Sequence, residues 1–193
     1  MDSIVRRVVI KNLQKVFWIY LTNNFVITSA NSLKQLTFPP ERRIVPITEE
    51  NYFRVREFRE EDLVSEYHEK LRRGERGAFA EIDGTMVGSL WATTNEGLVP
   101  NIVRTYMKLG PREALIHDIF TGEKYRGSGI GPFLLREIVR ELLDKPGVEK
   151  IIIDVNFRNG PSLKMMDKFG LNMSGQMLCV SVCGRPILRG VLR

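Results

Sequence analysis

The feature that most constrains the fold is a glycine-rich turn at residues 125–131, Tyr-Arg-Gly-Ser-Gly-Ile-Gly. The apolar segment 115–121 before it predicts a buried strand, and apolar residues at helical spacing over 132–144 predict a helix that begins at Pro132. Glycines allow close approach to backbone N–H groups, and such groups at a helix N-terminus bind phosphate. We therefore expect a phosphorylated cofactor on a strand–turn–helix unit.

The spacing of this turn disfavours two common phosphate-binding turns. A nucleoside-triphosphate loop needs Gly-Lys followed by Ser or Thr, which the segment lacks. In a dinucleotide-binding turn the third glycine would stand one residue later. Asp154 occupies the position of a ribose-binding acid, but too little chain follows it to complete a doubly wound sheet. On the turn alone, a glycine-rich turn without a ligand stays open as an alternative.

The rest of the chain predicts strands and helices in a mixed order. Strands are expected at 43–47, 78–82, 85–92, 115–121, 150–155, 175–183 and 186–192. Helices are expected at 49–58, 60–73, 99–109, 132–144 and 159–169. The dipeptide Asp83-Gly84 between two apolar runs is a strong hairpin signal. The order predicts an α/β (α+β) fold in which helices flank a mixed sheet.

The N-terminal region is predicted to be a helical appendage over residues 1–40, with the main domain over residues 41–193. Pro39-Pro40 marks the boundary, because proline cannot extend a helix. Val5–Leu21 is apolar with basic interruptions, which predicts a basic amphipathic helix. We expect its apolar face to pack on its own domain or on a second subunit in a homodimer. Peripheral contact with an anionic membrane is the less favoured alternative.

Composition indicates a globular protein and excludes few functions. Hydrophobic residues at 43% and charged residues at 27% argue against disorder. The net charge is +6, but basic runs and interleaved aromatic residues are lacking, so no nucleic-acid partner is expected. The cysteines and histidines are too dispersed to predict a metal site. The sequence contains no recognisable signal peptide and no run of eighteen apolar residues, which predicts a cytoplasmic location.

A second motif follows the glycine turn at a characteristic distance. It consists of Asn159-x-x-Ser162 and then Lys168-Phe169-Gly170, while residues 126–131 match the pattern R-x-x-G-x-G. Together these motifs resemble the GNAT superfamily of N-acetyltransferases from about residue 41 to the end. The resemblance implies a mostly antiparallel sheet with splayed central parallel strands, and acetyl-CoA as the cofactor.

The resemblance also implies which residues bind coenzyme A. The backbone around 119–121 would pair with the pantetheine arm, and the amides of 126–131 would hold the pyrophosphate at a helix N-terminus. Asn159 and Ser162 would contact the arm, cap the last helix, or do both. The implied cofactor-binding residues are Ile119, Phe120, Thr121, Arg126, Gly127, Ser128, Gly129, Ile130, Gly131, Asn159 and Ser162.

Catalysis would require a base that deprotonates an attacking amine. His117 is the first candidate, because it lies on the strand next to the cofactor and imidazole titrates near neutral pH. A hydrogen-bonded histidine with no catalytic role is the competing interpretation. Asp118 is the alternative base, and strand alternation predicts that it points to the opposite face.

Two further expectations concern the reaction itself. Many GNAT enzymes carry a tyrosine in the last helix that protonates the leaving thiolate, but Met166 stands at that position and a thioether cannot donate a proton. The expected activity is acetyl transfer to a primary amine of a small molecule, with an amino sugar preferred. The alternative is a non-catalytic acyl-CoA-binding or regulatory module with the same fold.

Overall fold

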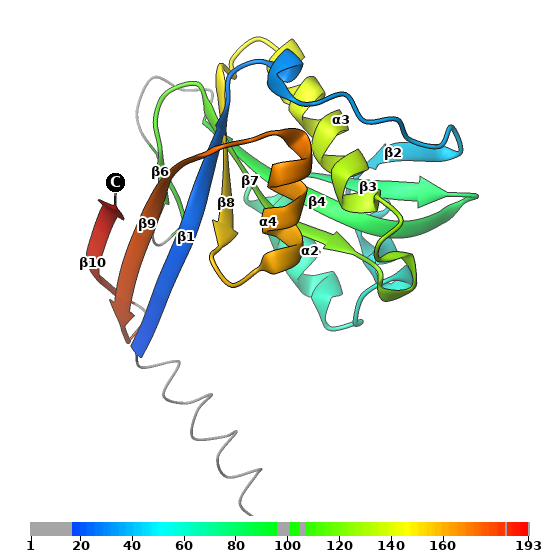
Figure 1. Cartoon of the computed structure of the whole chain (residues 1–193). Coiled ribbons are helices and arrows are strands. Elements are labelled where there is room, and N and C mark those ends of the chain that lie inside the picture. Colours follow the sequence, from blue (N-terminus) through cyan, green and yellow to red (C-terminus); the bar gives the residue numbers. More distant parts are fainter. Residues whose placement is uncertain (1–16, 96–100, 105–106, 184, 193) are drawn as a thin grey trace, which may run out of the picture.

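The computed structural model describes residues 17–95, 101–104, 107–183 and 185–192 of the 193-residue chain (Figure 1). One large twisted sheet of eight strands forms its centre, and β5 and β6 pair separately. In spatial order the strands of the large sheet are β10 (Arg185–Leu192), β9 (Met173–Val182), β1 (Phe17–Ile27), β8 (Lys150–Asn156), β7 (Glu113–Thr121), β4 (Thr85–Asn95), β3 (Arg76–Ile82) and β2 (Arg42–Pro46). The small pair consists of β5 (Asn101–Arg104) and β6 (Met107–Leu109).

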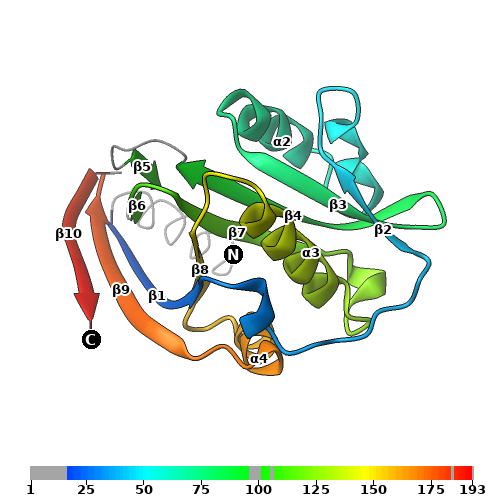
Figure 2. The ribbon, with the colours of Figure 1, turned by 90° about the horizontal axis from the view of Figure 1, so that it is seen from above.

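Helices cover both faces of the sheet. Figure 2 shows α2 on one face and α3 with α4 on the other. The helices are η1 (Ala30–Ser32), η2 (Tyr52–Glu57), α2 (Leu63–Arg72), η3 (Glu123–Tyr125), α3 (Ile130–Asp144) and α4 (Gly160–Phe169). The larger hydrophobic core lies under α3 and α4, and a smaller core around Tyr67, Phe79 and Trp91 lies under η2 and α2.

The two helices after the glycine turn form for the reasons that the sequence suggested. In α3, buried residues such as Leu134, Ile138 and Leu142 recur at helical spacing, and burial of each such side chain contributes about 1.5–3 kcal/mol. In α4, the side chain of Asn159 accepts the N–H of Ser162 at 3.2 Å, and Gly170 ends the helix with a φ of 72°. Both predicted helices are confirmed.

The hairpin and the fold class are also confirmed. β3 and β4 pair across Asp83-Gly84, both with positive φ, as a tight hairpin turn requires. Within the large sheet every adjacent pair is antiparallel except β7 with β8. The result is the expected α/β architecture of a mostly antiparallel sheet flanked by helices, with a parallel pair at its centre.

The N-terminal appendage requires a correction. Residues 17–27 form a strand in the middle of the sheet, so the predicted helix is wrong over 17–21 and the predicted appendage is wrong over β1; residues 1–16 lie outside the described residues. β1 bonds to β8 on one edge and to β9 on the other. Two ladders of backbone hydrogen bonds, with Phe25 and Ile27 buried in the core, outweigh the weak helical pattern of the segment.

Two further helix predictions were wrong in part. Where a helix was expected over 99–109, the described residues form β5 and β6, because the β-branched Ile102 and Val103 favour an extended chain. Where a helix was expected over 49–58, the chain forms the short 3-10 helix η2. None of the helices in the described part of the chain is long and apolar enough to span a membrane.

Candidate active site

The parallel strands β7 and β8 separate at the centre of the sheet. They pair only from Glu113 with Lys150 to Ile116 with Ile153. Beyond that point β7 stays bonded to β4, and β8 stays bonded to β1, so the two strands part as a fork. We call the space between residues 117–121 and 154–156 the fork; its open edges offer backbone groups to an extended ligand.

Thr121 directs a backbone donor into the fork. The N–H of Gly122 donates to the carbonyl of Val87 in β4 at 2.8 Å. Because successive residues of a strand bond to opposite neighbours, the N–H of Thr121 points away from β4 and toward the fork. The predicted segment 119–121 therefore has the geometry to pair with a pantetheine-like arm.

A β-bulge distorts β7 at the fork. The register with β4 shifts between Ser89–Phe120 and Trp91–His117, and Asp118 has a φ of 48°. An extra residue in one strand disturbs the alternation of its side chains. The expectation that His117 and Asp118 point to opposite faces is therefore wrong, since both reach partners on the face covered by η2 and α2.

His117 is buried beside a carboxylate. Its Nε2 lies 3.1 Å from Oε2 of Glu75 and 3.1 Å from the hydroxyl of Thr93, and only 6% of the residue is exposed. Burial alone would raise the pKa of Glu75, but its contacts with His117 and Arg73 outweigh burial and lower that pKa. An ionised Glu75 beside the imidazole helps to orient the ring and would stabilise its protonated form.

Asp118 forms ion pairs with two cations. Nζ of the buried Lys70 contacts Oδ2 of Asp118, and Nη1 of Arg59 lies 3.2 Å from Oδ1. Burial would raise the pKa of Asp118, but Lys70 and Arg59 outweigh it and lower the pKa. Arg59 also lies over the ring of Phe120, with 4.2 Å to its centroid. Asp118 is consequently a weak base, and its ion pairs link α2 and the segment before α2 to β7.

The opposite wall of the fork is also polar. Asp154 stands on β8, one residue beyond the last position that pairs with β7. The hydroxyl of Tyr20, from β1, lies 3.4 Å from Oδ2 of Asp154. Acidic and hydroxyl groups therefore flank the fork on the side of the N-terminal strand.

The glycine turn exposes a row of backbone donors. Gly127 and Gly129 have φ values of 80° and 88°, which residues with a Cβ rarely adopt. Among the described residues, no acceptor is assigned to the N–H groups of Gly127, Gly129, Ile130 or Gly131. A Cβ on Gly131 would lie 3.3 Å from the sulfur of Met165, so the third glycine allows close packing of α3 against α4. This geometry fits a pyrophosphate at the N-terminus of α3.

The other residues singled out from the sequence differ in their burial and contacts. Ser162 lies half-buried in the first turn of α4, where its N–H is capped by Asn159. The side chain of Arg126 is 59% exposed and pairs with Glu123 at 3.1 Å, rather than lying over the turn. Met166 is fully buried in the core, so α4 offers no proton donor at that position.

Sequence reasoning missed Glu75, Lys70, Arg59 and Thr93. Each is a polar residue whose role depends on its tertiary neighbours, and Lys70 looks like a solvated position of an amphipathic helix. The dense charge pattern of 59–75 was the only available signal, and it is usual for an exposed helix. No group of three or more His, Cys, Asp or Glu in the described part of the chain is arranged to hold a metal ion.

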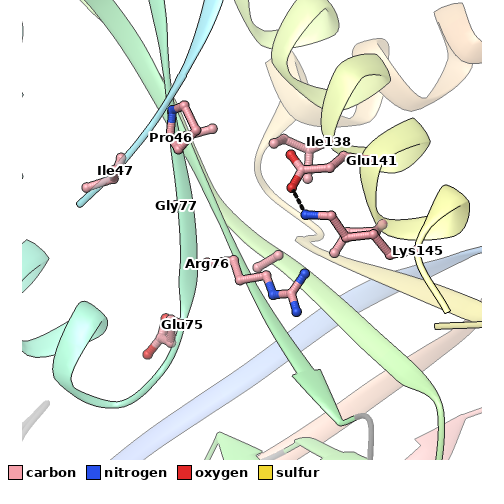
Figure 3. Close-up of a pocket in the computed structure, with 11 residues that line it drawn as sticks. Pro46, Ile47, Glu75, Arg76, Gly77, Ile138, Glu141 and Lys145 are labelled. Atoms are coloured by element: carbon pink, nitrogen blue, oxygen red, sulfur yellow. Dashed lines mark hydrogen bonds and ion pairs between the residues drawn. The ribbon is translucent and has the colours of Figure 1, made fainter. Parts of the chain in front are cut away.

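A cavity of about 450 Å³ lies at the other end of α3. Figure 3 shows Arg76 of β3 pointing toward Glu141 of α3 and Lys145, the residue that follows α3, while Glu75 points away from them. Glu141 and Lys145 pair with each other. Because the glycine turn adjoins the opposite, N-terminal end of α3, this cavity is separate from the candidate cofactor site.

Comparisons with known proteins agree with this geometry. Residues 41–171 match the sequence model of the Acetyltransferase (GNAT) family. A comparison with functionally curated proteins found no match. Among solved structures, a putative GNAT-family acetyltransferase from Novosphingobium aromaticivorans superimposes with a TM-score of 0.56 at 14% identity, over 84% of this chain and 63% of that one.

Two further solved structures have named activities. A glucosamine N-acetyltransferase region of a fungal multi-domain β-N-acetylglucosaminidase gives a TM-score of 0.58 at 16% identity, over 92% of this chain and 23% of that one. The aminoglycoside N-acetyltransferase AAC(6')-Iy, in complex with CoA, gives 0.52 at 18% identity, over 68% of this chain and 92% of that one. At these identities the likeness concerns the fold. The chain spans less than two thirds of several of the chains it matches, for example 58% of a Drosophila protein.

Proposed function

Because the chain belongs to the GNAT family of acetyltransferases, we propose that it transfers an acetyl group from acetyl-CoA to the primary amine of a small molecule. One observation carries the proposal: a forked parallel pair leads directly into a turn whose backbone N–H groups have no acceptor assigned within the described part of the chain. The fork suits an extended arm, and the turn suits a pyrophosphate at a helix N-terminus. Coenzyme A joins these two chemical groups in one molecule.

The proposed cofactor contacts follow the chain from β7 to α4. The N–H of Thr121 would bond to the pantetheine arm, and the amides from Gly127 to Gly131 would bond to the pyrophosphate. Asn159 and Ser162 lie at the start of α4, beyond the end of β8, where they would contact the arm. Bound acetyl-CoA supplies an activated thioester carbonyl, which a backbone N–H of β7 that faces the fork would polarise.

His117 is the better of the two proposed bases. Its imidazole lies on β7 at the fork, and the carboxylate of Glu75 would stabilise the imidazolium that forms when the ring accepts a proton from the amine. Asp118 is less suited, because Lys70 and Arg59 lower its pKa and stabilise its charged form. Its proposed role is to hold α2 and the segment before α2 against β7 and thereby shape the acceptor side of the fork.

The leaving thiolate receives no proton from α4 in this proposal. Met166 is buried and cannot donate one. A simple thiol has a pKa of about 8.5, so the thiolate is a tolerable leaving group near neutral pH. Direct transfer therefore remains chemically feasible without the usual tyrosine.

An amino sugar is the proposed acceptor. Asp154 and Glu75 are acids near the fork that would attract an ammonium group. Two proteins with similar folds are described as acting on glucosamine and on aminoglycosides, which is compatible with this choice. A cytoplasmic location and a homodimer remain predictions from the sequence.

The second candidate function is a non-catalytic acyl-CoA-binding or regulatory module, and the buried Met166 favours it.

One experiment separates the enzyme from the non-catalytic module. The protein is incubated with acetyl-CoA and a panel of glucosamine, an aminoglycoside and simple alkylamines, and release of free CoA is followed with a thiol reagent. Because Cys183 is exposed, a Cys183→Ser variant removes the background reaction of the protein. We expect amine-dependent release of thiol that is fastest with an amino sugar. Tight binding of acetyl-CoA without turnover on any amine would favour the module.

A further inference from the structure

The positive charge at the glycine turn does not come from the arginine of the motif. Arg126 is paired with Glu123 and its side chain is largely exposed. Another guanidinium lies against the turn. Arg42, the first residue of β2, donates from Nη2 to the carbonyl of Ser128 at 2.7 Å. It reaches the turn from a strand at the far edge of the large sheet.

Arg42 lies directly beside the second glycine of the turn. A Cβ on Gly129 would lie 3.4 Å from Nη1 of Arg42. Gly129 is also the N-cap of α3, so the guanidinium adjoins the positive end of that helix. The positive charge of Arg42 and the positive end of α3 repel each other, and an anion bound between them would offset this repulsion.

The charge of Arg42 has no carboxylate partner among the described residues. Arg126 pairs with Glu123, and Arg136 pairs with Glu137. Within the described part of the chain, the bond to Ser128 is the one hydrogen bond assigned to the Arg42 side chain, and its Nε is buried without an acceptor. A guanidinium has five N–H donors and binds phosphate oxygens in a fixed fork geometry, so several donors remain for a ligand.

An aromatic residue holds Arg42 in this place. The guanidinium carbons of Arg42 and Arg136 lie 5.9 Å and 4.3 Å from the ring centroid of Phe38. Phe38 packs edge-on against Phe133 of α3, with 5.6 Å between ring centroids. Arg136 also donates to the carbonyl of Leu36 at 2.7 Å. The segment before β2 is thereby fixed along α3, and Arg42 is delivered to the N-terminus of that helix.

We propose that Arg42, and not the motif residue Arg126, is the side chain that binds the pyrophosphate of coenzyme A. The proposal rests on the proposed function, since it names a residue for the same cofactor site. It assigns a binding role to Arg42, which lies far ahead of the glycine turn in the sequence. Phe38 is then a positioning residue that acts through Arg42.

Binding measurements on the full chain test the proposal. Dissociation constants are measured by calorimetry for CoA, 3'-dephospho-CoA and pantetheine, with wild-type protein, Arg42→Met and the matched control Arg126→Met. Loss of one charge-assisted hydrogen bond should weaken binding about 10-fold or more. We expect that loss in Arg42→Met for both CoA and 3'-dephospho-CoA, with pantetheine unchanged. Arg126→Met should stay within about twofold of wild type, as an exposed ion pair would.

The other possible outcomes would overturn either the role of Arg42, its contact with the pyrophosphate, or the proposed function. If wild type binds CoA and Arg42→Met binds it equally well, Arg42 has no role and only this inference fails. A loss with CoA but not with 3'-dephospho-CoA would assign Arg42 to the 3'-phosphate and overturn the pyrophosphate contact. An equal loss with pantetheine, or a lower melting temperature without ligand, would mean that Arg42 only holds the turn together. If wild type does not bind CoA at all, the proposed function itself fails.

A second variant checks the positioning role without touching the charge. Phe38→Leu keeps an apolar side chain against Phe133 but removes the ring under the guanidinium. We expect weaker CoA binding than in wild type, with a smaller loss than in Arg42→Met. In the double variant the Phe38 substitution should add little. Full additivity of the two losses would contradict a role that acts through Arg42.

Discussion

The two sides of the fork are built in different ways. The cofactor side presents backbone N–H groups from one short segment, and three glycines within residues 127–131 give it its shape. The acceptor side presents His117 and Asp118, whose partners come from α2 and from the segments just before α2 and just before β3. A site made of backbone is encoded locally, whereas a site made of paired side chains exists only after the chain has folded.

The largest expected effect tests the acceptor side alone. His117→Ala should lower kcat by about 10²–10⁴, the usual contribution of a general base, and leave CoA binding unchanged. Asp118→Asn should lower kcat much less, because its carboxylate is already neutralised by Lys70 and Arg59. Turnover with an amino sugar and CoA calorimetry give the two readouts. If Asp118→Asn proves the more damaging, the choice of His117 is wrong.

The next effect concerns stability. Lys70→Met should destabilise the protein by about 2 kcal/mol, less than the loss of a fully buried pair, because Arg59 still faces Asp118 and that carboxylate is partly exposed. Chemical denaturation measures the change. Adding Asp118→Asn should restore part of the loss, since the unpaired charge is removed. Arg72→Met, on the same helix with an exposed ion pair, is the matched control and should cost little.

A smaller effect is expected in the glycine turn. Gly129→Ala places a Cβ on a residue with a φ of 88°, which costs roughly 1–2 kcal/mol. In a protein of this size that corresponds to a fall in melting temperature of about 2–8 °C. CoA binding should weaken as well, while the amine KM should not change. Gly160→Ala is the control, since a Cβ there meets no atom within 4 Å and φ is not positive. Equal effects of both variants would contradict the importance of the left-handed backbone.

The smallest expected effect is a loss of folding stability at low pH. The pKa values of Glu75 and Asp118 are lowered in the folded protein. Groups with a lowered pKa stabilise the fold fully above their unfolded pKa of about 4, and this stabilisation is lost as the pH falls through the folded pKa. The melting temperature should therefore drop below about pH 4. The drop should be shallower in Asp118→Asn; an identical pH profile would show that Asp118 does not contribute.

The same contrast explains what could be predicted from the sequence. The helices α3 and α4 follow from local signals such as Pro132, Asn159 and Gly170, and both predicted helices are confirmed. The bulge at Asp118 has no local signal, because it arises from pairing between β7 and β4. Without the bulge the orientation of Asp118 could not be predicted.

The position of β1 in the sheet could not be predicted from the local sequence either. Its aromatic and β-branched residues suit a buried strand, but basic residues before it suggested an amphipathic helix. Only its two neighbours, β8 and β9, decide between the alternatives. Arg42 was hidden for a related reason, since nothing in the local sequence connects it with a turn that it meets only in the folded sheet.

The place of β1 in the sheet has a consequence for biosynthesis. Tyr20 and Asp154 touch across 134 positions of sequence, so β1 is translated well before the strand that it flanks. At typical elongation rates it waits on the order of ten seconds for that partner. An apolar strand that waits so long with two unpaired edges is exposed to aggregation and needs protection at the ribosome. Trimming the chain up to Ile27 would remove a central strand rather than a dispensable leader.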